Sequence, residues 1–96
     1  MKHLGKALKY LRIFKGFSAT DLARKLSVTR ATVSSVELGK HYPSVQLLAK
    51  YSEVCDISIS QIFALAEWLD NDEPMRKVDM VVMEKWFVDS GMFMDM

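Results

Sequence analysis

Residues 19–38 read ATDLARKLSVTRATVSSVEL and carry the strongest structural signal in the chain. Two short helical patterns, ATDLARKL and TRATVSSVEL, are separated in this stretch by Ser27 and Val28. The second pattern places Val33 and Val36 one turn apart, which gives that helix an apolar face, and Val28 is placed to fill the angle between the helices. Two short helices joined by so tight a turn predict a helix-turn-helix unit, whose second helix enters the major groove of DNA.

The sequence around this unit predicts three further helices. Apolar residues recur at helical spacing over about residues 2–15, and Gly16 follows as a C-terminal cap. Similar patterns cover residues 45–54 and about residues 58–69. Residues suited to the N-cap position precede four of the five helices, namely Ser18, Thr29, Ser44 and Ser58. Asp21 and Gln61 each stand three residues after such a cap, as in a capping box. The fold class is therefore predicted to be all-α.

The composition is that of one folded domain. The chain has 96 residues, half of them hydrophobic, which is enough for one compact core. No apolar run approaches the roughly 18 residues of a membrane span. Lys and Arg are interspersed among the apolar residues of residues 1–16, which indicates an amphipathic helix rather than a secretory signal. Cys55 is the only cysteine, so no intramolecular disulfide is expected, and we predict a buried apolar residue in a cytoplasmic protein.

Charge is divided unevenly between the two halves of the chain. Residues 1–50 carry ten Lys and Arg against two acidic residues, whereas residues 51–96 carry three against ten. A basic half followed by an acidic half suggests that one part meets a polyanion and the other does not. Two solvated surfaces of unlike sign would give the same distribution. The helix-turn-helix pattern lies in the basic half, which favours a nucleic acid as the partner.

The motifs resemble those of the lambda-repressor-like family of Cro/C1-type (xenobiotic-response-element) regulators. The resemblance covers about residues 4–67 and rests on Leu11-Arg12, Gly16-Phe17-Ser18, Asp21-Leu22-Ala23, residues 33–37 (VSSVE), Gly39-Lys40 and Pro43-Ser44. It implies a five-helix DNA-binding domain over residues 1–69 that is followed by a C-terminal extension. It also implies an ion pair between Arg12 and Glu37, which would clamp the first helix to the end of the third.

Two positions depart from the family pattern. The family often has Gln at the first position of the second helix, where it contacts a phosphate, but this chain has Ala19. The turn position usually held by Gly is Ser27. Ser27 must therefore adopt a left-handed backbone at some cost or change the turn.

The base-reading residues are predicted to lie on the side of the third helix that is opposite its apolar face. They are Arg30, Ala31, Ser34 and Ser35. Arg30 is the only long donor among them, and a bidentate bond from Arg to guanine is the commonest specific contact; a phosphate contact or a solvated side chain is the alternative. The predicted phosphate contacts are Ser18, Thr20, Lys25, Thr29 and Lys40. The family resemblance supports Lys40 most directly.

The family resemblance ends at about residue 67, so the segment after Trp68 is interpreted from its composition and its apolar pattern. Residues 70–77 open with an acidic stretch and Pro74, which predicts a linker. Residues 78–96 are apolar and rich in Met, and a helix fits their pattern better than a strand. Because apolar residues occupy more than one face, this segment must bury against something. Its own domain, a second copy in a dimer and a different protein are the three alternatives.

These features predict a dimeric repressor that reads an inverted-repeat operator in double-stranded DNA with residues 29–38. The alternative is an antitoxin-type interaction protein whose C-terminal segment binds a partner protein. An enzyme is not expected, because the sequence lacks a phosphate-binding glycine loop, a metal-ligand cluster and a nucleophile–base pair. For the same reasons no metal and no cofactor are expected.

Overall fold

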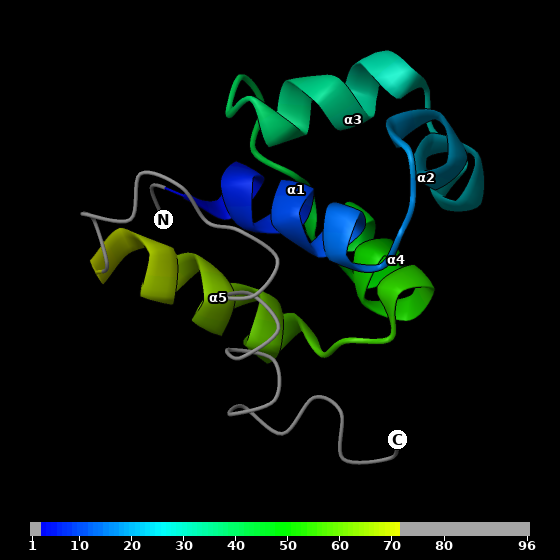
Figure 1. Ribbon diagram of the computed structural model, residues 1–96. Helices are drawn as coiled ribbons and strands as arrows, with labels where there is room; N and C mark the ends of the chain where they lie inside the picture. Colours follow the sequence, from blue (N-terminus) through cyan, green and yellow to red (C-terminus); the bar gives the residue numbers. More distant parts are fainter. Residues whose placement is uncertain (1–2, 72–96) are drawn as a thin grey trace.

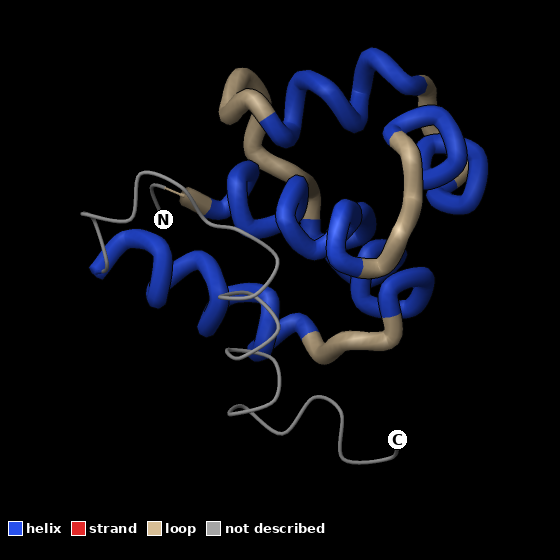
Figure 2. Tube along the Cα trace, viewed as in Figure 1, coloured by secondary structure: helices blue, strands red, loops and turns tan. Residues whose placement is uncertain are grey.

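The computed structural model describes residues 3–71 of the 96-residue chain, and this part folds into five α-helices (Figure 1). The helices are α1 (Leu4–Phe14), α2 (Ala19–Leu26), α3 (Arg30–Glu37), α4 (Val45–Cys55) and α5 (Ile59–Asn71). Loops and turns join them, and the described residues contain no strand (Figure 2). The prediction of an all-α domain with five helices is confirmed. Residues 78–96, for which a helix is predicted, lie outside the described residues.

The helices surround a single core. Helix α1 lies in the middle, with α3 on one side and α5 on the other (Figure 1). Helix α2 packs against both α3 and α4, and α4 also packs against α5. Each helix therefore has at least two neighbours, and α3 is held between α1 and α2.

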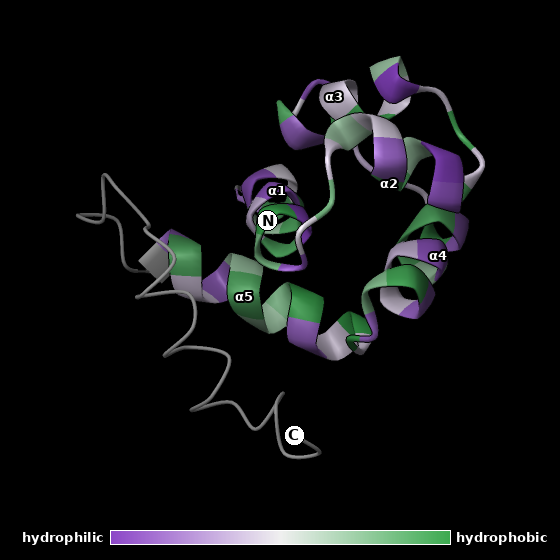
Figure 3. Cartoon of the chain, turned by 45° about the vertical axis from the view of Figure 1, so that its right-hand side comes forward, coloured by the Kyte–Doolittle hydropathy of each residue, from purple (hydrophilic) through white to green (hydrophobic). Residues whose placement is uncertain are grey.

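The core consists of the apolar faces of these helices. In Figure 3 most apolar residues lie on the sides of α1, α4 and α5 that face one another. The largest side chains that are almost fully buried are Tyr51, Leu4, Leu8, Leu11, Leu22, Leu26, Ile62, Leu65, Val33 and Cys55. Burial of each Leu, Ile or Val contributes about 2 kcal/mol relative to an exposed position. The expectation that Cys55 is a buried apolar residue is confirmed.

The predicted N-caps begin the helices as expected. The hydroxyl oxygens of Ser18, Thr29 and Ser44 accept backbone N–H bonds of 3.0–3.1 Å from the residues three positions later. Ser58 and Gln61 form the complete capping box, because the Gln61 N–H donates to Ser58 Oγ and the Ser58 N–H donates to Gln61 Oε1. At the start of α2 the Asp21 N–H donates to Ser18 Oγ, as in one half of such a box, and the Asp21 carboxylate lies 3.7 Å from Arg24.

Left-handed residues end several helices. Gly16 and Gly39, which follow α1 and α3, have φ of 83° and 78°. Ser27 and Asp56 adopt the same region at the ends of α2 and α4, with φ of 60° and 54°. The Val28 N–H then donates to the Ala23 carbonyl at 3.0 Å, which satisfies one of the last free carbonyls of α2. Of the two outcomes expected for Ser27, the structure shows the first: the turn is unchanged, and Ser27 adopts the left-handed backbone, which is less favourable for serine than for glycine.

Several helix boundaries differ by one or two residues from the expected ones. Helix α1 ends at Phe14, and Lys15 is its C-cap. Helix α5 continues two residues past Leu69, to Asn71. The side chain of Asp70 bonds to His3 at the start of α1, and this contact holds the last turn of α5 against α1. No helix within residues 3–71 is long and apolar enough to cross a membrane.

Candidate nucleic-acid interface

The α2–α3 unit is built around a small apolar interface. Leu22 and Leu26 of α2 and Val33 and Val36 of α3 are all buried. Val28, in the turn, packs partly buried against the same cluster. Because these residues fix the inward faces of both helices, the opposite face of α3 is turned to solvent. The geometry is that of a helix-turn-helix, as the sequence predicts.

The structure divides the four predicted base-reading residues into two pairs. Arg30 and Ser34 line a hollow of about 460 Å³ between α1 and α3, called here the α1–α3 hollow. Ala31 and Ser35 line a second hollow, of about 360 Å³, which also includes His41. Arg30 and Ala31 are exposed, whereas Ser34 and Ser35 are half-buried. The N-terminal turn of α3 is therefore the most accessible part of the predicted reading face.

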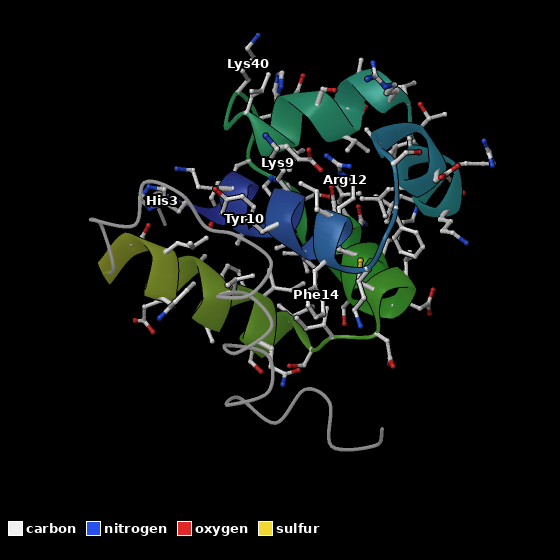
Figure 4. The ribbon with its side chains drawn as sticks, viewed as in Figure 1. His3, Lys9, Tyr10, Arg12, Phe14 and Lys40 are labelled. Atoms are coloured by element: carbon white, nitrogen blue, oxygen red, sulfur yellow. The ribbon has the colours of Figure 1, made fainter. Side chains whose placement is uncertain are left out.

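All five predicted phosphate-binding residues are exposed, namely Ser18, Thr20, Lys25, Thr29 and Lys40. The Ser18 hydroxyl oxygen accepts a helix-capping bond, and its O–H remains able to donate to a phosphate. Lys25 Nζ lies 5.3 Å from the centroid of the Phe17 ring, a cation–π contact that orients its side chain. Lys40 projects from the loop after α3 (Figure 4). These residues lie at both ends of the α2–α3 unit.

The ion pair implied by the family resemblance is present in the structure. Arg12 Nε and Nη2 donate to the two carboxylate oxygens of Glu37 at 2.7 and 3.1 Å. The side chains are only 13% and 7% exposed, so the pair is largely shielded from water. Its hydrogen bond to Glu37 raises the pKa of Arg12. Arg12 Nη1 also donates to the Phe17 carbonyl at 3.0 Å. The guanidinium thus joins α1, the loop before α2 and the end of α3.

Gly5 is a structural residue that the sequence reasoning missed. A Cβ atom at this position would lie 2.3 Å from the Val36 carbonyl oxygen and 2.9 Å from that of Glu37. Only glycine therefore lets α1 approach the last turn of α3 so closely. The available signal was a glycine in the first turn of a helical pattern, where it has no capping role.

Two residues of α4 have environments that the sequence did not reveal. Tyr51 is fully buried, and its hydroxyl has no hydrogen-bond partner among the described residues. Burial, together with the nearby Glu37 carboxylate, raises the pKa of Tyr51 well above its ordinary value. Lys50 Nζ donates to the Leu26 carbonyl at 3.3 Å, which ties α4 to the end of α2.

Cys55, the last residue of α4, is chemically inert. Burial raises the pKa of the Cys55 thiol to about 11, so this cysteine stays protonated and unreactive at neutral pH.

The geometry defines a helix-turn-helix DNA-binding domain, and comparison with known proteins gives its family. The family model described as helix-turn-helix matches residues 8–62, more than half of the chain. An uncharacterized HTH-type transcriptional regulator of Methanocaldococcus jannaschii is 39% identical over 56 residues, which cover 58% of this chain and 85% of that protein. The chain therefore belongs to the Cro/C1-type helix-turn-helix family.

Two further sequence relatives have assigned names. The competence pilus inhibition repressor of Acinetobacter baylyi is 31% identical over 74 residues, which cover 77% of this chain and 67% of that protein. The HTH-type transcriptional regulator SinR of Bacillus subtilis is 39% identical over 57 residues, which cover 58% of this chain and 51% of SinR. Among solved structures, the clp gene regulator ClgR from Corynebacterium glutamicum has the same fold, with a TM-score of 0.67 and 21% identity over 97% of this chain and 90% of ClgR.

These findings establish the function at the level of the family. The protein is a transcriptional regulator with a helix-turn-helix domain that binds double-stranded DNA. Members of this family are DNA-binding proteins rather than enzymes.

Proposed function

We propose that this chain is a dimeric transcriptional repressor that places α3 in the major groove of an inverted-repeat operator. The observation that carries the proposal is the accessible first turn of α3, whose last turn is fixed to α1 by the Arg12–Glu37 pair. A helix held in this way presents its N-terminal side chains to base edges in one orientation. The name of the similar Acinetobacter protein, a repressor, supports repression rather than activation.

Within this proposal the reading face of α3 has two parts. Arg30 binds guanine O6 and N7 with both of its terminal nitrogens, a contact worth about 1–3 kcal/mol of discrimination. Ala31 and the Thr32 methyl group approach a thymine methyl group, and Ser35 lies beside them in the same hollow. Ser34, which lies on the α1 side, contributes less to base preference than Ser35.

Phosphate contacts fix the position of the domain on the DNA. Ser18 and Thr20 act at the start of α2, and Thr29 acts at the start of α3, where free backbone N–H groups and the helix dipole favour an anion. Lys25 and Lys40 add charge at the two edges of the unit. Such contacts set affinity and register but carry no sequence information directly.

The small size of the reading surface supports dimerisation. One recognition helix reads a short half-site, and dimers of this class span two half-sites about 34 Å apart. We assign DNA binding to the domain that ends with α5 at Asn71, a linker to residues 72–77 and dimerisation to residues 78–96, because the last of these is strongly apolar in sequence. A regulator of this kind acts in the cytoplasm, where the DNA is accessible to it.

The proposal is tested by selecting DNA from a random library with the full chain. We expect an enriched inverted repeat and a dimer in sedimentation equilibrium. Val82→Asp places a charge in the apolar segment and should give a monomer that binds the repeat weakly, whereas Gln46→Glu adds the same charge to the exposed surface of α4 and should change neither property. Failure to enrich any motif, at low and at moderate salt, would contradict sequence-specific DNA binding and favour the partner-binding alternative.

A further inference from the structure

The α1–α3 hollow is a concave, positively charged site that lies beside the predicted reading face. Its volume is about 460 Å³, and the charged side chains in its lining are Lys6, Lys9, Arg12, Arg30 and Glu37. Figure 4 shows Lys9 and Arg12 on the side of α1 that faces α3. The hollow is therefore built from two helices rather than from one flexible loop.

The hollow has a net positive charge that the described part of the protein does not neutralise. Glu37 is the only acidic residue in its lining, and both of its oxygens are bound by Arg12. Lys6, Lys9 and Arg30 are exposed cations, and within residues 3–71 none of them forms an ion pair. Three cations that converge on one concavity, with their only carboxylate already paired, favour an anionic ligand.

The neutral groups and the position of the hollow indicate which kind of anion fits. The hydroxyl of Ser34 can donate a hydrogen bond. Ala19, the first residue of α2, lies at the edge of the hollow, so the positive end of the α2 dipole adds to the field there. Arg30 belongs both to the hollow and to the proposed reading face. DNA that binds to the reading face would therefore lie beside the hollow.

We propose that the α1–α3 hollow is a phosphate subsite and that Lys6 and Lys9 are its binding residues. The shared chemistry is a phosphate oxyanion, which can be supplied by the backbone of bound DNA or by a free phosphorylated compound. With DNA as the source, the proposal rests on the proposed function and extends the DNA interface from α2 and α3 onto α1.

The first test measures how DNA affinity depends on salt, using the full chain and the selected operator. Lys6→Gln and Lys9→Gln should each lower the slope of log affinity against log salt by about one, with an affinity loss of about fivefold at about 0.15 M salt. Lys15→Gln is the matched control, because it removes the same charge at the opposite end of α1, outside the lining of the hollow. It should change the slope by much less.

The second test titrates inorganic phosphate into the DNA-free protein and follows the backbone amides by NMR. Saturable shifts at Lys6, Lys9 and Ser34 that disappear in Lys6→Gln and Lys9→Gln support the subsite. If those shifts occur while the two variants match Lys15→Gln in DNA binding, the ligand is a free phosphate compound. Variants that match Lys15→Gln, together with no localised phosphate shift, overturn the proposal.

The two tests also separate this inference from the proposed function. If the wild-type chain binds no DNA sequence, the proposed function fails, and the phosphate titration alone then decides the subsite. In that case localised shifts support a site for a free phosphorylated compound, and their absence overturns it.

Discussion

The two ends of α3 are built in opposite ways. At its C-terminal end the helix lies against α1, where Gly5 permits backbone contact and the Arg12–Glu37 pair joins the two helices. At its N-terminal end Thr29 caps the helix, and Arg30 and Ala31 are exposed. The difference indicates that stability and recognition occupy separate turns of one short helix. Substitutions at the fixed end should therefore change folding, and those at the open end should change DNA binding.

The largest effect is expected from Gly5→Ala at the fixed end. The new methyl group would lie 2.3 Å from the Val36 carbonyl oxygen, so the backbones of α1 and α3 would have to move apart. Although Ala is the better helix former, we expect a loss of about 3 kcal/mol in the free energy of unfolding, measured with urea. Gly16→Ala is the control, because its methyl group meets nothing within 4 Å and only the positive φ of 83° penalises it. Equal losses at the two positions would show that the contact between α1 and α3 is not tight.

The next largest effect is expected at the ion pair. Arg12→Gln and Glu37→Gln should each cost about 2 kcal/mol, because each leaves a largely shielded charge without its partner. The double variant should cost less than the sum of the two, and that difference measures the coupling. The exposed Asp21–Arg24 pair, at 3.7 Å, is the comparison, and Arg24→Gln should cost less than about 0.5 kcal/mol. Additive losses at Arg12 and Glu37 would contradict a clamp between α1 and α3.

A smaller effect of opposite sign is expected in the turn before α3. Ser27 has a left-handed backbone with φ of 60°, which costs about 1 kcal/mol more for serine than for glycine. Ser27→Gly should therefore raise the thermal midpoint, and Ser27→Ala, which keeps the Cβ atom, should not. A loss of stability in the glycine variant would mean that the serine hydroxyl supports the turn.

The smallest effect on stability is expected at the open end. Arg30 is exposed and forms no ion pair within residues 3–71, so Arg30→Ala should change the free energy of unfolding by less than about 0.5 kcal/mol. Its effect should appear instead in library selection, as loss of base preference at one position in each half-site. Equal weakening on every DNA sequence would assign Arg30 to a phosphate and not to a base.

Local patterns predicted most of the fold, because caps, glycines and apolar spacing act within a few residues. Ser18, Thr29, Ser44 and Ser58 begin helices as expected. The close approach at Gly5 and the unpartnered hydroxyl of Tyr51 depend on residues far away in the sequence, and no local pattern contains them. The same reason explains the site: helical periodicity placed Arg30 and Ser34 on the outer face of α3, but only the packing of α1 shows that they share a hollow.

The division of α3 into a fixed end and a reading end is tested by an NMR footprint of the selected operator on the full-length protein. We expect the largest amide shifts at Arg30 and Ala31, with further shifts at Ser18, Thr29 and Lys40, while the Arg12 and Glu37 amides change little. Shifts concentrated on α4 and α5, with α3 unchanged, would contradict the claim that α3 is held at one end in order to read DNA with the other.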